Sequence, residues 1–176
     1  MISFLNKFFP IFARPASRRE ELTELLQESL DDKTSFDSHE GTLLQNFLGL
    51  RDTTAADVMV PRADIVSVAL ADAFDDIIQQ MSDANHSRVP VYRETLDDVA
   101  GIIHIKDLFA NLRNGQTPSV DSLLRPALFI SPTIRLLDLL HEMRLRRRHL
   151  ALVVDEFGGV DGLITIEDLV EEIVGE

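Results

Sequence analysis

The chain has 176 residues with no Cys and no Trp, and it carries 17 Lys and Arg against 30 Asp and Glu, a formal net charge of −13. This balance disfavours binding to nucleic acid, because a phosphate backbone is held by clustered Lys and Arg side chains. The absence of Cys excludes disulfides, thiolate catalysis and Cys-based metal sites, and no apolar run approaches the roughly 20 residues that cross a bilayer. The length suits one globular domain or two small ones.

The first 19 residues differ from the rest of the chain. They hold four basic residues, no acidic residue and four of the ten Phe. A secretory signal peptide is excluded, because Lys7 interrupts the apolar stretch and Pro10 breaks it. Two interpretations remain open. The segment is either a loose or partner-packed terminus, or an aromatic and basic segment that lies on a membrane surface.

A helical preamble is predicted to follow this segment. Ser17 and Glu20 have the spacing of a capping box, and Leu residues at helical spacing then predict a helix over 18–31. The polar stretch 31–41 indicates a loop. A second short amphipathic helix is indicated by Leu43, Leu44, Phe47 and Leu48.

From Thr54 onward, short β-branched runs alternate with amphipathic helical patterns. Strands are predicted at 65–68, 88–92, 99–104, 128–130, 150–154 and 160–164. One helix is predicted to be capped by Asp72, and another to begin with Ser131 at the N-cap and Pro132 as its first residue. Two further helices are predicted over 106–112 and 167–174.

The order of these elements occurs twice. Matching residues of the two copies are separated by 61 to 65 residues, and segments 101–108 and 162–169 are identical at five of eight positions. A unit of about 60 residues buries little surface alone, so two copies packed sheet against sheet are the expected stable object. The predicted fold is of the α/β (α+β) class: two β-α-β-β-α units with pseudo-twofold symmetry and two equivalent clefts, preceded by a helical segment.

Thr165 and Asp168 lie where a predicted strand runs into a helix. Both side chains can face one ligand beside the exposed N–H groups of the helix N-terminus. A carboxylate suits a sugar diol, and a hydroxyl at a helix N-terminus suits a phosphate. The alternative is an ordinary capping box between these two residues, without a ligand.

The repeat resembles a tandem pair of CBS domains, also called a Bateman module, which senses adenine nucleotides. Four motifs narrow the resemblance to the CorC/HlyC family of magnesium and cobalt efflux proteins and hemolysin-like proteins. These motifs are Asp57-Val58-Met59-Val60-Pro61-Arg62, His86-Ser87-Arg88-Val89-Pro90-Val91, Asp155-Glu156-Phe157-Gly158-Gly159-Val160 and Thr165-Ile166-Glu167-Asp168. The resemblance implies a preamble over 1–50, one CBS repeat over 51–115 and a second over 116–176.

The resemblance also implies a site for ATP or AMP, with or without Mg²⁺, in the cleft between the copies. Thr165 and Asp168 would hold phosphate and ribose, and Ile164 would line the base pocket. His86, Arg88 and Pro90 would contact base and phosphates, although Arg88 could instead form a surface salt bridge. In the equivalent cleft Asp107 matches Asp168, but His104 replaces Thr165. One occupied site per chain is therefore expected.

Three classes of function remain. The favoured one is a non-enzymatic nucleotide-binding module, linked to magnesium and cobalt efflux, that forms a homodimer and serves a membrane transporter. The second is a hemolysin-like membrane-associated protein, and the third is a ligand-free scaffold for protein partners. The expected location is cytoplasmic, including attachment to the inner face of the cell membrane. A C-terminal transporter-associated domain, which the resemblance implies in longer members, is not expected within these residues.

Overall fold

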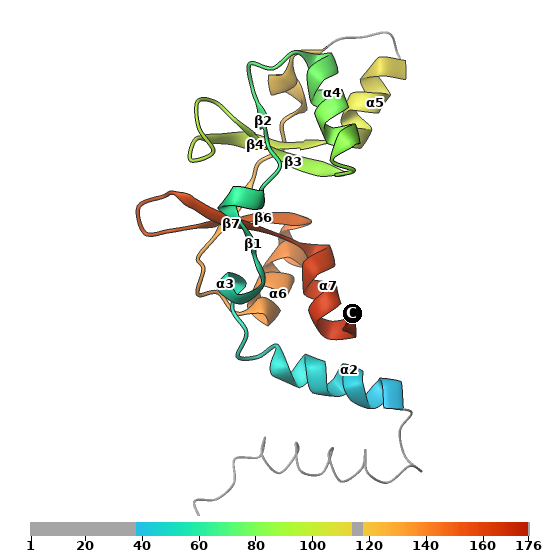
Figure 1. Ribbon diagram of the computed structural model, residues 1–176, viewed down its shortest axis with the longest axis vertical. Helices are drawn as coiled ribbons and strands as arrows, with labels where there is room; N and C mark the ends of the chain where they lie inside the picture. Colours follow the sequence, from blue (N-terminus) through green and yellow to red (C-terminus); the bar gives the residue numbers. More distant parts are fainter. Residues whose placement is uncertain (1–37, 114–117, 176) are drawn as a thin grey trace, which may run out of the picture. The chain divides into compact units, whose positions relative to one another are not determined.

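The computed structural model describes residues 38–113 and 118–175 (Figure 1). The helix predicted over 18–31 and both interpretations of the first 19 residues lie outside this part of the chain. The predicted second helix is present as α2, Ser38–Gly49. It begins earlier than expected, so the predicted loop is wrong over residues 38–41. Glu40 in its first turn favours this early start, because a negative charge complements the helix dipole there.

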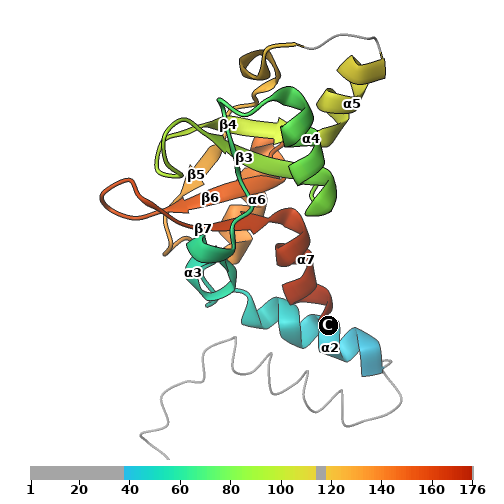
Figure 2. The same cartoon turned by 45° about the horizontal axis from the view of Figure 1, so that its top comes forward.

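The compact unit Asn46–Glu176 contains both repeats. Each repeat forms a sheet with a parallel strand pair followed by an antiparallel one, as Figure 2 shows for the second repeat. The first sheet has the order β2-β3-β4, from Val68–Ala69, Arg88–Tyr92 and Val99–His104. The second has the order β1-β7-β6-β5, from Val60–Pro61, Val160–Thr165, Leu150–Val154 and Leu128–Ile130. The predicted α/β class and tandem repeat are confirmed.

Helices cover the outer face of each sheet (Figure 1). The first sheet is covered by α4, Phe74–Asp83, and α5, Ile105–Arg113, and the second by α6, Leu136–Arg146, and α7, Ile166–Val174. Three short helical turns complete the unit: α3, Ala55–Val58, η1, Arg62–Asp64, and η2, Val120–Leu123. The apolar faces of the helices and sheets pack together into one hydrophobic core in each repeat. A third apolar cluster joins the inner faces of the sheets and includes Ile102, Leu152 and Leu163.

Three local predictions differ from the structure. The strand expected at 65–68 begins only at Val68, because residues 62–64 form the turn η1. Asp72 does not cap α4; its carboxylate accepts the N–H of Ala69 at 2.9 Å, and the N-cap is Ala73. The helix expected to start at Pro132 starts at Leu136 instead.

Long-range hydrogen bonds explain the late start of α6. The carbonyls of Pro132 and Ile134 accept the N–H groups of Ala56 and Ala55 at 3.0 and 2.9 Å. Carbonyls committed to another segment are not free to accept bonds within a helix. The segment before α6 therefore stays extended against the segment around α3.

The two repeats exchange their leading segments. Strand β1 precedes the first sheet in sequence but pairs antiparallel with β7 of the second sheet, where Val60 lies opposite Leu163. The matching residue before the second repeat, Arg125, pairs with Ile102 of β4 through backbone hydrogen bonds of 2.8 and 2.9 Å. Each sheet is thus completed by a segment that leads into the other repeat.

The exchange depends on two glycines at matching positions of the repeats. A Cβ atom on Gly162 would lie 2.8 Å from the carbonyl oxygen of Val60, and one on Gly101 would lie 2.8 Å from that of Arg125. Real Cβ atoms do not approach backbone oxygens this closely. The glycine shared by both copies is therefore a requirement of packing.

A polar clasp also joins the repeats. Arg62 forms a bidentate ion pair with Asp97 of the β3–β4 hairpin and donates to the carbonyl of Val160 at 2.7 Å. The Val160 N–H donates to Asp97 at 2.9 Å. The hydrogen bonds that Asp97 accepts lower the pKa of its carboxyl group to about 2, and the bond from Arg62 has the largest effect. The clasp therefore favours the ionised carboxylate.

Gly162→Ala is expected to destabilise the protein by about 1–3 kcal/mol, because the added methyl group forces β1 away from β7. Urea unfolding measures the change. Gly49→Ala is the control, since its added methyl group meets nothing within 4 Å. Equal stability of the two variants would show that the strand exchange does not need a glycine.

Asp97→Asn is expected to lower stability at pH 7 and to weaken its dependence on pH in acid. A folded-state pKa of about 2 lies below the unfolded value of roughly 3.9, so the clasp stabilises fully above pH 4. That stabilisation is lost as the pH falls through about 2. Urea unfolding between pH 7 and pH 2 tests this. Asp98→Asn leaves the contacts to Arg62 and Val160 in place and should be nearly as stable as wild type at pH 7. Parallel pH curves for wild type and Asp97→Asn would contradict the assignment.

Candidate functional site

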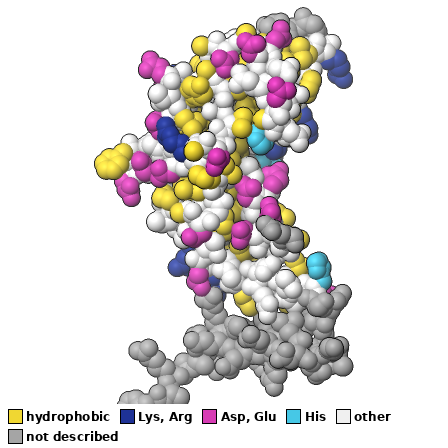
Figure 3. Space-filling model, in the orientation of Figure 1, with side chains coloured by type: hydrophobic (Ala, Val, Ile, Leu, Met, Phe, Trp, Pro, Cys, Tyr) yellow, Lys and Arg dark blue, Asp and Glu magenta, His cyan; other side chains and the backbone are white. Residues whose placement is uncertain are grey.

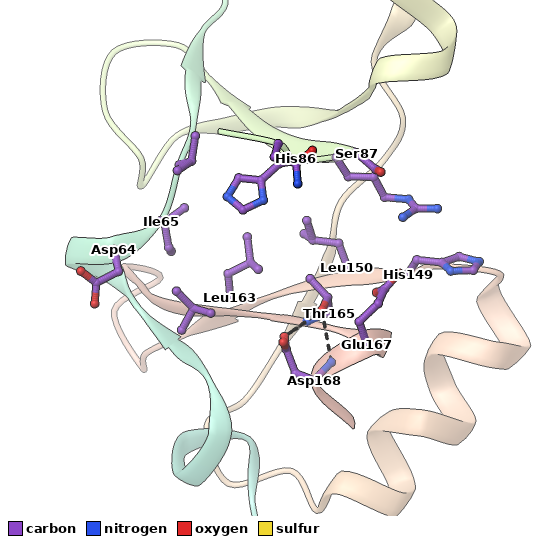
Figure 4. A pocket seen from close by; sticks show the side chains of 14 residues that line it. Asp64, Ile65, His86, Ser87, His149, Leu150, Leu163, Thr165, Glu167 and Asp168 are labelled. Carbon is purple, nitrogen blue, oxygen red and sulfur yellow. Dashed lines mark hydrogen bonds between the residues drawn. The ribbon is translucent and has the colours of Figure 1, made fainter. Parts of the chain in front are cut away.

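A cavity of about 390 Å³ lies between the two repeats, where β7 runs into α7. Figure 4 shows its two walls: His86 and Ser87 precede β3 on one side, and Leu163, Thr165 and Asp168 lie on the other. Four of the six predicted site residues line this cavity. They are His86, Arg88, Thr165 and Asp168.

Thr165 and Asp168 form a reciprocal capping box at the start of α7. The Thr165 N–H and hydroxyl both donate to Oδ2 of Asp168, at 2.7 and 2.8 Å, and the Asp168 N–H points back to the hydroxyl at 3.4 Å. No residue of the described ranges donates to Oδ1 of Asp168. The box thus fixes the carboxylate with one oxygen still available to a ligand.

Arg88 is half-buried at the start of β3, opposite His104 of β4. Within residues 38–113 and 118–175 it has no acidic partner closer than 4 Å. An unpaired guanidinium beside a cavity is suited to a ligand with planar oxyanions, which it can bind with two parallel hydrogen bonds. The imidazole of His86 points into the cavity (Figure 4).

Pro90 and Ile164 do not line the cavity. Ile164 is fully buried in the core of the second repeat, and Pro90 is buried in the middle of β3. For Ile164 the reason is the alternation of side chains along a strand. Because Thr165 faces the cavity, so does Leu163, while Ile164 faces the helices. The apolar lining consists of Val60, Ile65, Val66, Leu150 and Leu163, none of which the motifs indicated as site residues. Strand alternation could have indicated Leu163 from the sequence.

The equivalent end of β4 borders a second cavity, of about 330 Å³. Here Asp107 is not available to a ligand, because Arg125 binds both of its oxygens at 3.0 Å. His104 stands in place of Thr165, is 8 % exposed, and accepts the N–H of Lys106 on Nδ1 at 3.1 Å. Burial, followed by the charges of Arg88 and Arg125, lowers the pKa of His104.

The strand exchange explains why the two carboxylates differ. The exchanged segment brings Val60 beside β7 and brings Arg125 to the matching place beside β4. Val60 has no charge and leaves Asp168 uncovered, whereas Arg125 neutralises Asp107. Of the two clefts that the repeat generates, only the one at Asp168 keeps a free carboxylate oxygen.

Comparison with known proteins establishes the family of the chain. The family pattern of the CBS domain matches residues 55–114 and 120–175, so the chain belongs to the CBS-domain family and carries two copies in tandem. A solved CBS domain of the bacterial CNNM/CorC family Mg²⁺ transporter, in complex with an inhibitor, has a TM-score of 0.83 and 34% identity, covering 89% of this chain and 97% of that one. The chain is thus a CBS-domain pair of the CNNM/CorC family, as its motifs indicated.

Two further solved structures contain adenine nucleotides. The CBS domain of the bacterial CNNM/CorC family Mg²⁺ transporter in complex with ATP is 37% identical, with a TM-score of 0.73, covering 78% of this chain and 98% of that one. A CBS-domain pair with bound AMP from Klebsiella pneumoniae is 29% identical, with a TM-score of 0.61, covering 70% and 99%.

Curated relatives carry two kinds of name. The hemolysin C homolog of Rickettsia rickettsii is 47% identical over 77% of this chain and 46% of that protein. The magnesium and cobalt efflux protein CorC of Vibrio cholerae is 36% identical over 99% of this chain and 60% of that protein. The chain therefore spans about half the length of the curated relatives it matches.

Neither a membrane span nor a metal centre is evident in the described part of the chain. None of its helices is long and apolar enough to cross a bilayer. It also contains no group of three or more His, Asp or Glu side chains that could hold a metal ion.

Arg125→Gln is expected to raise the pKa of His104. The substitution removes a nearby positive charge and frees the Asp107 carboxylate, and both changes favour the protonated imidazole. NMR titration of the His104 ring measures the shift. Arg93→Gln is the control, because Arg93 pairs with Asp98 in the turn of the β3–β4 hairpin, at the opposite end from His104. An unchanged His104 pKa in Arg125→Gln would mean that burial alone sets it.

Proposed function

We propose that this module binds an adenine nucleotide, ATP or AMP, in the cavity at Asp168, and thereby regulates magnesium and cobalt efflux. The observation that carries the proposal is the uncovered carboxylate of Asp168, fixed by Thr165 at a helix N-terminus, in a chain whose relatives include CBS domains solved with ATP and AMP. An ionised carboxylate that accepts from a ribose hydroxyl forms a charge-assisted hydrogen bond, which is stronger than a neutral one.

Each part of the nucleotide has a chemically suited wall. The free oxygen of Asp168 would accept from the ribose. The base would lie against Ile65 and Leu163, with the imidazole of His86 beside it. The N–H groups at the start of α7, together with Arg88, would contact phosphate oxygens.

Mg²⁺ is expected to assist the binding of ATP. The cavity also contains the carboxylates of Asp64 and Glu167, and acidic side chains are spread over the face drawn in Figure 3. These charges repel a free triphosphate. A bound Mg²⁺ lowers the charge of ATP and hence this repulsion. AMP carries less charge and needs no such compensation.

The regulatory role would be non-enzymatic. A nucleotide that contacts both repeats favours one arrangement of the repeats over another, and a homodimer of modules could pass this preference to a transporter partner. Bacterial Mg²⁺ transporters of the CNNM/CorC family, whose CBS domains are similar to this chain, are the model for that partner. The location that fits this role is the cytoplasmic face of the membrane.

The hemolysin-like alternative is supported by the names of several relatives and by the Phe-rich basic segment at the start of the sequence. It predicts binding to lipid, whereas the regulatory role does not need that segment. Flotation with liposomes, for the full chain and for the chain without residues 1–16, separates the two. Loss of lipid binding in the shortened chain would favour the alternative.

Asp168→Ala is expected to weaken ATP binding by about 1–3 kcal/mol, roughly 5- to 150-fold in Kd, because it removes the acceptor for the ribose hydroxyls. Calorimetric titration with ATP, ADP and AMP, with and without Mg²⁺, measures the change. Asp168→Asn retains an oxygen for the helix cap, so a similar loss of affinity there would separate binding from folding.

Asp107→Ala is the matched control, since it changes the equivalent carboxylate that Arg125 covers. It should bind nucleotide like the wild type. The opposite result, with affinity lost in Asp107→Ala and kept in Asp168→Ala, would place the nucleotide in the other cleft. No binding by any of the proteins would favour the ligand-free scaffold.

A further inference from the structure

The second cavity has the opposite charge to the first, although the two are built from matching positions of the repeat. Asn85 and His86 beside the first cavity correspond to Arg147 and Arg148 beside the second, and Glu167 corresponds to Lys106. With Arg88 and Arg125, five cationic side chains line the second cavity against one carboxylate, that of Asp107. In a chain with 17 Lys and Arg and a net charge of −13, this concentration is exceptional.

Most of this charge is uncompensated. Arg125 is paired with Asp107. The other four cations, Arg88, Lys106, Arg147 and Arg148, have no acidic side chain within 4 Å among the described residues. Like charges held together in a half-open cavity raise the free energy of the empty site, and an anion between them lowers it.

One residue beside this cavity is of an unusual type for its backbone conformation. Arg147 ends α6 in the left-handed conformation, with φ of 54°. Glycine or asparagine normally occupies this position, and the matching residue Asn85, with φ of 55°, follows that rule. An arginine accepts the strain here while its charge borders the cavity.

The cavity is not built for a nucleoside. Its carboxylate is held by Arg125, so no acceptor remains for a sugar diol, and the capping hydroxyl is replaced by the buried His104. Cations, together with the N-terminus of the nine-residue helix α5, remain. Such a set of donors recognises oxyanions and offers little to a base or a sugar.

We propose that the cavity lined by Arg88, Lys106, Arg125, Arg147 and Arg148 is a binding site for a phosphate chain, separate from the nucleotide cavity at Asp168. The phosphate oxygens could belong to a free polyphosphate or to the tail of a nucleotide held next door. Arg88 and His149 line both cavities, so the phosphate tail of a nucleotide in the first cavity can extend into the second. The site does not require the proposed nucleotide function.

Tripolyphosphate without Mg²⁺ is the probe, titrated calorimetrically into the full chain. The double variant Arg147→Gln with Arg148→Gln should bind it on the order of tenfold more weakly or worse, because two charge-assisted hydrogen bonds are lost. The double variant Arg144→Gln with Arg146→Gln is the matched control. It removes the same charge from the same helix end, but neither residue lines the cavity. Equal weakening in both double variants would mean general electrostatic attraction and would overturn the proposal.

The ring of His104 reports on the same cavity. A bound phosphate chain should raise the pKa of His104 in an NMR titration, since it offsets the nearby cations. Binding without any change at His104 would place the anion elsewhere and overturn the site. Loss of tripolyphosphate binding in Asp168→Ala would also overturn the proposed site, because the anion would then lie in the first cavity.

The source of the phosphate is distinguished by competition. If ATP displaces tripolyphosphate from the wild type but not from Asp168→Ala, the second cavity receives the tail of the bound nucleotide. If ATP and tripolyphosphate bind to the wild type at the same time, the second cavity receives a free polyphosphate. Failure of ATP to bind at all would end the proposed nucleotide function and leave this site intact.

Discussion

The exchange of leading segments between the two repeats is the constraint on which the rest of this structure depends. Strand β1 completes the sheet of the second repeat, and the segment at Arg125 completes the sheet of the first. Both contacts require backbone to approach backbone at Gly101 and Gly162, where a side chain would collide. The repeats are thus held by hydrogen bonds as well as by the apolar cluster between their sheets.

This exchange also decides the chemistry of the clefts. A tandem repeat generates two equivalent cavities, but the exchanged segments differ between the copies, as do the matching positions that hold Lys106, Arg147 and Arg148 in one cavity. Val60 leaves Asp168 uncovered, while Arg125 closes Asp107. Symmetry of the backbone therefore coexists with opposite charge in the cavities. One keeps a free carboxylate oxygen at Asp168, and the other is lined by five cations.

Much of the fold could be predicted from the sequence because its signals are local. Strands β3, β4, β5 and β6 have the predicted bounds, since β-branched runs bounded by polar residues mark them clearly. The wrong prediction for the start of α6 has a different cause. Ser131 and Pro132 have the chemistry of a helix start, but the carbonyls of this segment bond to residues almost 80 positions earlier in the chain, and such partners leave no trace in a local pattern.

The features of the candidate site also divide into those that the sequence indicated and those that only the tertiary structure revealed. The sequence by itself determined the repeat and the family, and it singled out four residues that line one cavity, Thr165, Asp168, His86 and Arg88, because motif spacing and self-similarity are properties of the chain. Only the tertiary structure decided that Leu163 and not Ile164 faces the cavity, that Arg125 covers Asp107, and that five cations gather in the second cleft. These facts arise from contacts between residues distant in sequence, whose positions are fixed by the pairing of strands across the repeats.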